Sequence, residues 1–167
     1  DDRPVGGSLS RIYRDVRFTK DKSPYKTHVV ISFRHRLAKD VQTPGYYLYL
    51  GPREVFAAAG IWHPDRATLL RIRTAIVQKP GDWKKGTRGK AFTARFRLTG
   101  ERLTRAPAGF GPDHPMIEDL KWKDYFAVAL FDERTATRGD FVSLFARTCS
   151  AATPFMRFLC QALGRPF

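Results

Sequence analysis

Two short segments joined by a tight turn constrain the fold of this chain more than any other feature. Residues 46–50 (YYLYL) and 54–61 (EVFAAAGI) are rich in aromatic and aliphatic side chains, and residues 51–53 (GPR) between them contain a glycine and a proline, which favour turns. Alternate residues of the first segment fall on opposite sides of an extended chain, with Tyr46, Leu48 and Leu50 on one side and Tyr47 and Tyr49 on the other. We therefore expect a β-hairpin, and with it an antiparallel sheet.

The rest of the chain adds further strands and fewer helices. We expect extended segments at residues 9–18, 27–35, 94–98 and 125–130. A helix should begin after Asp65, a suitable N-cap, and end near Pro80-Gly81. Residues 116–123 are helical in pattern, and residues 141–163 predict a C-terminal helix, or two helices divided at Thr153-Pro154. Residues 83–90 are basic and show no clear pattern. Because strands and hairpins predominate, we predict an α+β fold in which a mostly antiparallel sheet packs with several helices.

Length and composition favour one domain with ample material for a core. The chain has 167 residues, of which 43% are hydrophobic and 13% aromatic, whereas domains cluster at roughly 100–150 residues. We therefore expect a single α+β domain over residues 1–167. The longest apolar runs, such as residues 126–131, are far shorter than the ~20 residues that cross a bilayer. No signal peptide opens the chain, so we expect a cytoplasmic protein without a membrane span.

The two cysteines, Cys149 and Cys160, lie eleven residues apart in helical sequence. In an unbroken helix this spacing separates them by about 16 Å, whereas a disulfide needs Cα atoms within about 7 Å. We expect two buried, reduced thiols.

One run of the sequence resembles the signature of a known family. Residues 14–28 (RDVRFTKDKSPYKTH) are similar to a bacterial and fungal family of uncharacterised proteins, domain of unknown function 2461, and residues 44–48 (PGYYL) and 59–64 (AGIWHP) resemble its middle section. The resemblance covers nearly the whole chain, although Gly111 stands where an acidic residue is expected before Pro112. Members of this family carry an additional helical segment at the N-terminus, and no Met opens this chain, so we expect such a segment upstream. The family has no assigned activity, and the resemblance therefore leaves the function open.

Basic charge is the strongest functional signal. The chain has 30 Lys and Arg against 16 Asp and Glu, a formal charge of +14, which attracts phosphates and nucleic acid. Eight of these cations fall between residues 11 and 36, interleaved with aromatic side chains. Cations neutralise phosphates and aromatic rings stack on bases, so the candidate ligand-binding residues are Arg14, Arg17, Lys20, Lys22, Tyr25 and Lys26. In the alternative interpretation, Asp15 and Asp21 pair with neighbouring cations and fix a solvated loop.

A second basic cluster spans residues 84–105, which contain eight cations and a single acidic residue, Glu101. If this cluster shares a face with the first one, the two would form a groove for nucleic acid. If it lies on the opposite side, solubility explains it.

The histidines, His28, His35, His63 and His114, do not have metal-binding spacing and no CxxC motif accompanies them, so we expect no metal and no cofactor. Candidate catalytic residues are those that could act as general acids or bases, namely His28, Asp15, Asp21, Asp113 and His114. For Asp113-His114 a structural turn is the commoner explanation. Trp62 could be a stacking surface at a pocket, although a buried Trp at the end of a strand is more usual.

Three functions remain open. The first is an anion-recognising domain that binds a phosphate-bearing ligand, with nucleic acid as one option, through residues 14–28. The second is an enzyme acting on a small phosphorylated or acidic metabolite, which requires a concave pocket where Arg14, Arg17 and Lys26 converge with His28 or Asp113. The third is a protein-interaction domain, which requires an exposed apolar patch. The oligomeric state stays open.

Overall fold

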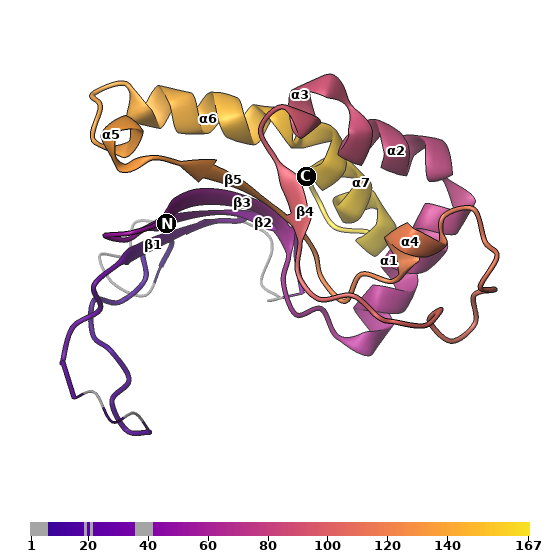
Figure 1. Ribbon diagram of the computed structural model, residues 1–167, viewed down its shortest axis with the longest axis horizontal. Helices are drawn as coiled ribbons and strands as arrows, with labels where there is room; N and C mark the ends of the chain where they lie inside the picture. The colour runs from indigo at the N-terminus through magenta and orange to yellow at the C-terminus, as the bar shows by residue number, and fades with distance from the viewer. Residues whose placement is uncertain (1–6, 19, 21, 36–41) are drawn as a thin grey trace.

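The computed structural model describes residues 7–18, 20, 22–35 and 42–167, and these form a five-stranded antiparallel sheet packed with helices (Figure 1). The strands are β1 (Val29–Phe33), β2 (Gly45–Leu50), β3 (Val55–Ile61), β4 (Arg97–Thr99) and β5 (Tyr125–Phe131). They lie in the order β1-β2-β3-β5-β4, and each neighbouring pair is antiparallel. The predicted α+β fold is confirmed.

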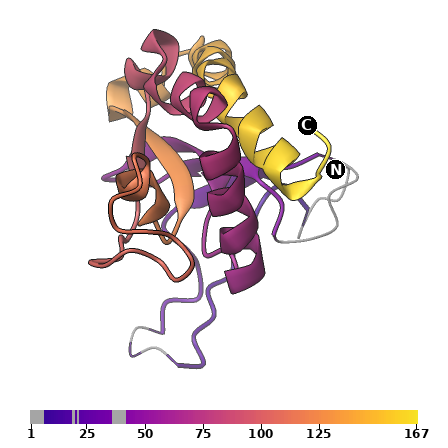
Figure 2. The same ribbon diagram turned by 90° about the vertical axis from the view of Figure 1, so that its right-hand side faces the viewer.

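The helices lie on one side of the sheet (Figure 1). The longer ones are α1 (Arg66–Gln78), α2 (Pro80–Arg88), α6 (Phe141–Ala151) and α7 (Thr153–Leu163), and the short ones are α3 (Lys90–Thr93), α4 (Ile117–Leu120) and α5 (Glu133–Ala136). Helix α7 packs against α1, α2 and β3, and Figure 2 shows α1 and α7 side by side. Among the described residues, no helix combines the length and the apolar character that a membrane crossing requires.

The predicted hairpin is confirmed. Strands β2 and β3 pair in the register Leu50 with Val55 and Tyr49 with Phe56, and the backbone N–H of Gly51 donates to the carbonyl of Glu54 at 2.9 Å. The alternation along the strands then separates two faces. Val55, Ala57, Ala59 and Ile61 of β3 are buried toward the helices, whereas Phe56, Ala58 and Gly60 are only half-buried on the other face.

Two helix boundaries also agree with the sequence. Asp65 caps α1, because its carboxylate accepts a 2.7 Å hydrogen bond from the backbone N–H of Thr68. The C-terminal helical sequence divides into α6 and α7, with Pro154 in the first turn of α7. Cys149 on α6 is half-buried, Cys160 on α7 is buried, and both thiols are free.

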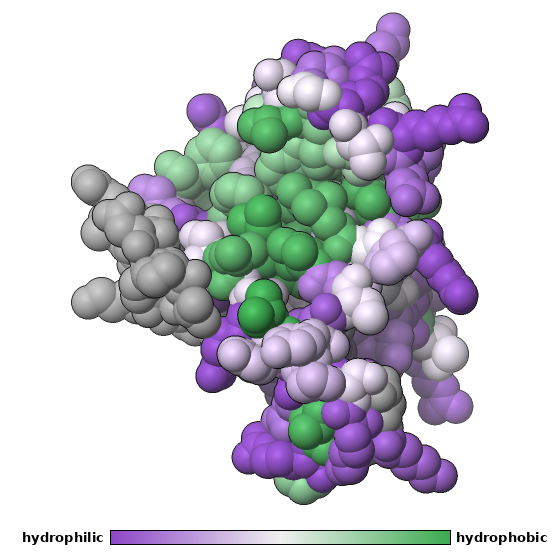
Figure 3. Space-filling model, turned by 90° about the vertical axis from the view of Figure 1, so that its left-hand side faces the viewer, coloured by the Kyte–Doolittle hydropathy of each residue, from purple (hydrophilic) through white to green (hydrophobic). Residues whose placement is uncertain are grey.

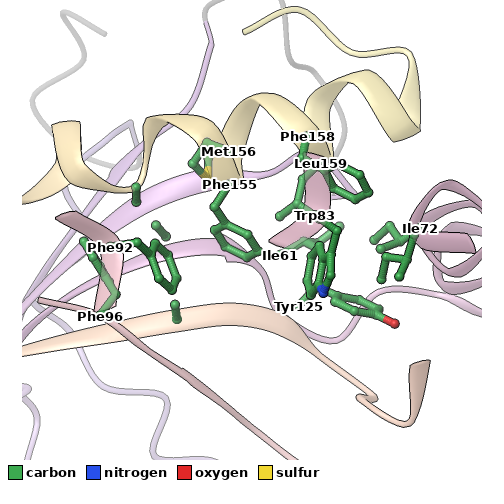
Figure 4. Packing of buried hydrophobic residues seen from close by; sticks show 14 of the residues in the cluster. Ile61, Ile72, Trp83, Phe92, Phe96, Tyr125, Phe155, Met156, Phe158 and Leu159 are labelled. Atoms are coloured by element: carbon green, nitrogen blue, oxygen red, sulfur yellow. The ribbon is translucent and has the colours of Figure 1, made fainter. Parts of the chain in front are cut away.

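The core between the helices and the sheet is built around Trp83 of α2, which is fully buried (Figure 4). Its indole ring meets Tyr125 of β5 and Phe155 and Phe158 of α7 edge-on, with centroid distances of 5.6, 5.8 and 5.3 Å. Aromatic rings prefer such edge-to-face contacts. Three elements that are far apart in the sequence therefore meet at one side chain.

Several predicted boundaries were wrong. Residues 83–90, which had no clear pattern, belong mostly to α2, because Trp83 anchors an otherwise polar helix in the core. The strand expected at 94–98 is limited to β4, Arg97–Thr99, since Phe92 and Phe96 pack as the end of a helical turn. The helix expected at 116–123 is limited to α4. Residues 9–18 form isolated bridges, at Leu9 and Tyr13, instead of a continuous strand.

Candidate functional site

The helices leave one face of the sheet uncovered (Figure 1). Apolar side chains of β3 and β5 lie on this face. On β5 the side chains of Phe126 and Val128 are half-buried on this face and Leu130 is 72% exposed. Figure 3 shows a broad hydrophobic area on the side of the molecule facing the viewer. Apolar surface of this kind is usual at binding sites and unusual elsewhere. We call this surface the open face.

A row of stacked rings crosses the open face between neighbouring strands. The rings of Tyr49 and Phe56 lie 5.0 Å apart and within 8° of parallel, as their pairing in the β2–β3 register requires. His28 stacks on Tyr49 at 4.9 Å, and Tyr47 lies 6.1 Å from Phe56. The structure therefore places the candidate His28 in this aromatic row. Burial raises the pKa of Tyr47 above its ordinary value.

Beside the row lies a cavity of about 410 Å³, a volume in the ~300–1,000 Å³ range of small-molecule sites. Small residues, including Ala58 and Gly60, leave the space, and aromatic residues, including Tyr47, Phe126 and Trp62, surround it. Gly60 has a φ of +125°, and a Cβ atom there would lie 2.2 Å from the carbonyl oxygen of Tyr125. Only glycine fits this position, and it lets the backbone of β3 run close to the backbone of β5 beside the cavity.

Trp62 lies at the end of β3 and is 67% exposed, so the interpretation as a buried Trp was wrong. Its neighbour Ile61 points into the core, and the alternation of the strand turns Trp62 toward the cavity that it lines. Beyond it, His63 adopts a positive φ of 47°, and its backbone N–H donates to the carboxylate of Asp124 at 2.8 Å. This contact holds the end of the strand in place.

Two polar residues of the cavity, Thr43 and Arg34, were not among the predicted site residues, although Arg34 was counted among the eight cations of residues 11–36. Thr43 is only 3% exposed, and its hydroxyl has no hydrogen-bond partner. Arg34 follows β1, and a Cβ atom on Gly45 would come within 2.9 Å of its Cγ atom. The arginine stem therefore crosses β2 where Gly45 has no side chain. The absence of a side chain at 45 was the one signal in the sequence that could have indicated this crossing.

The basic candidate residues belong to an arm, residues 8–18, 20 and 22–28, that extends from the sheet on the side away from the helices (Figures 1 and 2). At its base, the backbone of Ser8 and Ser10 pairs with β1, where Ser10 N–H donates to the carbonyl of Val30 at 2.9 Å. Further out, Lys26 N–H donates to Ile12 and Arg14 N–H to Pro24, both at 2.9 Å. The rings of Tyr13 and Tyr25 lie 5.6 Å apart across the arm. We call this segment the basic arm.

Two of the predicted cations of the basic arm are occupied by partners within it. Arg17 forms a two-point ion pair with Asp15, with distances of 2.9 and 2.7 Å, which lowers the pKa of the Asp15 carboxyl. The ammonium of Lys22 donates to the carbonyl of Val16 at 2.8 Å. For these residues the interpretation as a self-paired loop fits the geometry. Asp21, a catalytic candidate, lies outside the described residues.

Other side chains of the basic arm are open to partners. Within the described part of the chain, the ammonium groups of Lys20 and Lys26 make no hydrogen bond or ion pair. Phe18 is 93% exposed, and the Arg17 guanidinium lies 5.6 Å from the centre of its ring. Tyr25 is exposed as well. The basic arm, which carries these cations and aromatic rings, lies on the same side of the sheet as the open face (Figure 1).

Asp113 and His114 lie far from the basic arm. The loop before α4 is at the opposite end of the molecule (Figure 1), and the Nδ1 atom of His114 accepts a 3.0 Å hydrogen bond from the backbone N–H of Met116. This hydrogen bond, between residues two positions apart, is typical of a structural turn. The described residues therefore do not form the pocket of the enzyme hypothesis in which Arg14, Arg17 and Lys26 converge with Asp113. The alternative pocket, with His28 in place of Asp113, stays a prediction.

The second basic cluster does not extend the first one. Helices α2 and α3, which carry Lys84, Lys85, Arg88 and Lys90, lie in the helix layer, across the sheet from the basic arm (Figure 1). Some of its cations have structural roles, since Arg88 pairs with the buried Asp119 at 2.8 Å. Arg102 pairs with Glu118 and lies over the ring of Trp122. The cations of α2 and α3 therefore form no continuous groove with the basic arm, whereas Arg97 of β4, which pairs with Val128 of β5, lies on the side of the open face.

The described residues contain no group of three or more His, Cys, Asp or Glu side chains placed to hold a metal ion. Fold and site together define an α+β protein whose antiparallel sheet is covered by helices on one face and carries aromatic residues, a cavity and a basic arm on the other. The chain belongs to the DUF2461 family, described as a conserved hypothetical protein, whose sequence model matches residues 1–158. No curated protein matches the chain, and no solved structure matches it.

Proposed function

We propose that this protein recognises a phosphate-bearing partner, single-stranded nucleic acid, along the basic arm and the open face. The observation that carries this proposal is the meeting of the two surfaces at His28, whose ring stacks on Tyr49 at 4.9 Å while the basic arm leads away from it. Cations that follow a phosphate backbone beside aromatic rings that contact bases are the usual means of binding a single strand.

The charges favour a localised contact over a general attraction. Lys20 and Lys26 are on the basic arm, beside the exposed rings of Phe18 and Tyr25, whereas Lys84 and Lys85 are on the far side of the sheet. Unpaired bases can reach aromatic side chains, but bases stacked within a duplex cannot. The proposal therefore requires a preference for single strands.

Fluorescence anisotropy of labelled single-stranded and double-stranded RNA and DNA, titrated over salt, tests this proposal. We expect the logarithm of the affinity to fall linearly with the logarithm of the salt concentration, and each phosphate contact to contribute a slope of about 0.7 for a single strand. The double variant Lys20→Ala/Lys26→Ala should lower the slope by about 1.4. Lys84→Ala/Lys85→Ala removes the same charge from the far side and should have a much smaller effect. Equal losses in both variants, or no binding at low salt, would contradict the proposal.

A second candidate, a protein-interaction domain, is favoured by the exposed apolar surface. Leu130 on the open face and Phe18 on the basic arm are among the most exposed large hydrophobic side chains, and Figure 3 shows how far the hydrophobic area extends. Binding through such a surface depends weakly on salt, whereas nucleic-acid binding depends steeply on it. The salt titration of any partner that binds therefore separates the two functions.

A further inference from the structure

A residue that lines the cavity beside Trp62 carries a polar group without a hydrogen-bond partner among the described residues. Thr43 is one of the residues that line the cavity, it is 3% exposed, and its hydroxyl oxygen, which is itself buried, has no hydrogen-bond partner. Buried polar groups are nearly always hydrogen-bonded, because losing water without gaining a partner costs stability. Because Thr43 lines the cavity, a ligand bound there is the group placed to supply the missing bond.

The shape of the cavity suits a flat molecule. Its floor is formed by Ala58 and Gly60, whose small size exposes the surface of β3, and rings of Tyr47, Phe126 and Trp62 line it. Trp62 is 67% exposed although its ring is large and apolar. Aromatic rings bind other planar rings through stacked or edge-on contacts. A planar aromatic group fits these surroundings better than a branched or strongly polar one.

The cavity also has one positive charge. Arg34 lines it, with its stem laid across Gly45, and within the described residues the guanidinium has no hydrogen-bond or ion-pair partner. The described lining residues include no acidic side chain. A guanidinium binds carboxylate and phosphate groups through paired hydrogen bonds.

We propose that this cavity is a binding site for a small planar aromatic molecule that carries one anionic group. The ring lies over Ala58 and Gly60 beside Trp62, the anionic group pairs with Arg34, and a polar atom of the ligand satisfies the Thr43 hydroxyl. A nucleoside monophosphate and an aromatic carboxylate share this chemistry. The cavity shares Tyr47 and Phe56 with the aromatic row but contains no residue of the basic arm, so loss of nucleic-acid binding through Lys20 and Lys26 would leave this site intact.

Displacement of the fluorescent probe anilinonaphthalene sulfonate, which combines a planar naphthalene ring with an anionic sulfonate group, tests the proposed chemistry. Adenosine monophosphate and indole acetate combine a ring with an anionic group, adenosine and indole have the ring alone, and inorganic phosphate and acetate have the anion alone. We expect at least one of the first pair to displace the probe roughly tenfold better than its separated parts. Whichever of these two compounds displaces the probe better shows whether the anionic group of the ligand is a phosphate or a carboxylate. Equal displacement by the ring alone, or no displacement by any of the six, would overturn the proposal.

Matched variants locate the site. Ala58→Leu fills the floor of the cavity and should abolish probe binding, whereas Ala91→Leu makes the same change on the exposed surface of α3 and should leave it unchanged. Arg34→Gln should weaken binding of the anionic competitors roughly tenfold. Arg53→Gln, in the exposed β2–β3 turn, is its control. Probe binding that survives Ala58→Leu, or equal effects of Arg34→Gln and Arg53→Gln, would overturn the proposal. Because Arg34 is exposed, its variant tests the site even if Ala58→Leu fails to fold.

Thr43→Val distinguishes a role of the hydroxyl in ligand binding from a purely structural role. The substitution removes the unsatisfied hydroxyl at nearly constant volume, so the melting temperature of the free protein should not fall and should rise slightly. Binding of the competitor that displaces the probe best should nevertheless weaken roughly fivefold. A lower melting temperature together with unchanged ligand affinity would show that the hydroxyl serves the fold alone, and would overturn its role in the site. The Lys20→Ala/Lys26→Ala variant should bind the small molecules normally, which separates this result from the nucleic-acid experiment.

Discussion

The indole Nε1 atom of Trp83 donates a 2.8 Å hydrogen bond to the Oδ1 atom of Asp119, 36 residues further along the chain. Trp83 is fully buried, and the second carboxylate oxygen of Asp119 accepts a 2.8 Å hydrogen bond from Arg88. This carboxylate therefore ties α2 to the sequence around α4 and satisfies the polar atom of the largest core side chain.

Replacing Asp119 with alanine should destabilise the fold, because the buried indole N–H of Trp83 would lose its acceptor. Leaving a buried donor unsatisfied costs about 1–3 kcal/mol, so we expect a loss near the upper end in the free energy of unfolding measured with urea. Arg88→Ala is the comparison variant, since it keeps the Trp83 bond but leaves the second oxygen of the buried Asp119 carboxylate without its partner. An equal loss of unfolding free energy in both variants would show that the Arg88–Asp119 ion pair, and not the Trp83 hydrogen bond, provides the stabilisation.

Gly60 should not tolerate a side chain. Gly60→Ala would bring a Cβ atom within 2.2 Å of the Tyr125 carbonyl at a φ of +125°, and such backbone strain alone costs of order 1–3 kcal/mol. Gly81→Ala is the matched control, because a Cβ atom there meets nothing within 4 Å and Gly81 lies in α2. Alanine there should stabilise the protein by up to about 1 kcal/mol. Urea unfolding of the two variants should show shifts of opposite sign.

Alkaline pH should weaken the fold, because two buried groups hold their protons to a higher pH in the folded chain than in the unfolded chain. Burial raises the pKa of the Cys149 thiol from 9.0 to about 12 and that of the Tyr46 hydroxyl from 10.0 to about 12. Between about pH 9 and pH 12 the unfolded chain has released these protons and the folded chain still holds them. Stability is therefore fully present below pH 9 and falls as the pH rises through this window. The measurement is the free energy of unfolding as a function of pH, and a Cys149→Ala/Tyr46→Phe variant should show a shallower decline. An unchanged slope would assign the decline to other groups.

The aromatic row should contribute to single-strand binding through its rings and not merely through its apolar character. Phe56→Leu keeps an apolar side chain at the same position but removes the ring that stacks on Tyr49. Because base stacking is worth about 1–3 kcal/mol per aromatic residue, the anisotropy assay should show at least a roughly fivefold loss of affinity. Val142→Ala, on the exposed surface of α6, should leave the affinity unchanged. Undiminished binding by Phe56→Leu would restrict the contact to the basic arm.

Much of the local structure followed from the order of residues. The alternation of Tyr and Leu in residues 46–50 predicted both the hairpin and the two faces of its strand, and Asp65 predicted the start of α1. Pro154 predicted the division between α6 and α7. These features depend on interactions between residues at most a few positions apart, such as side-chain alternation and capping. The same alternation placed Tyr47 and Tyr49 together on one face, although nothing in the sequence showed which face would remain uncovered.

The candidate site was decided by the tertiary structure. Trp83 turned a basic segment without a pattern into α2 because residues of α7 and β5 surround its ring. Arg17 and Lys22 are occupied by partners within the basic arm, and Arg34 reaches the cavity only because Gly45 of the neighbouring strand leaves room. Periodicity and capping are local, whereas the helices that cover one face of the sheet, and the cavity left on the other, depend on contacts between distant segments. The sequence by itself determined the strands, their alternation and the caps, and tertiary packing decided which of those residues face a ligand.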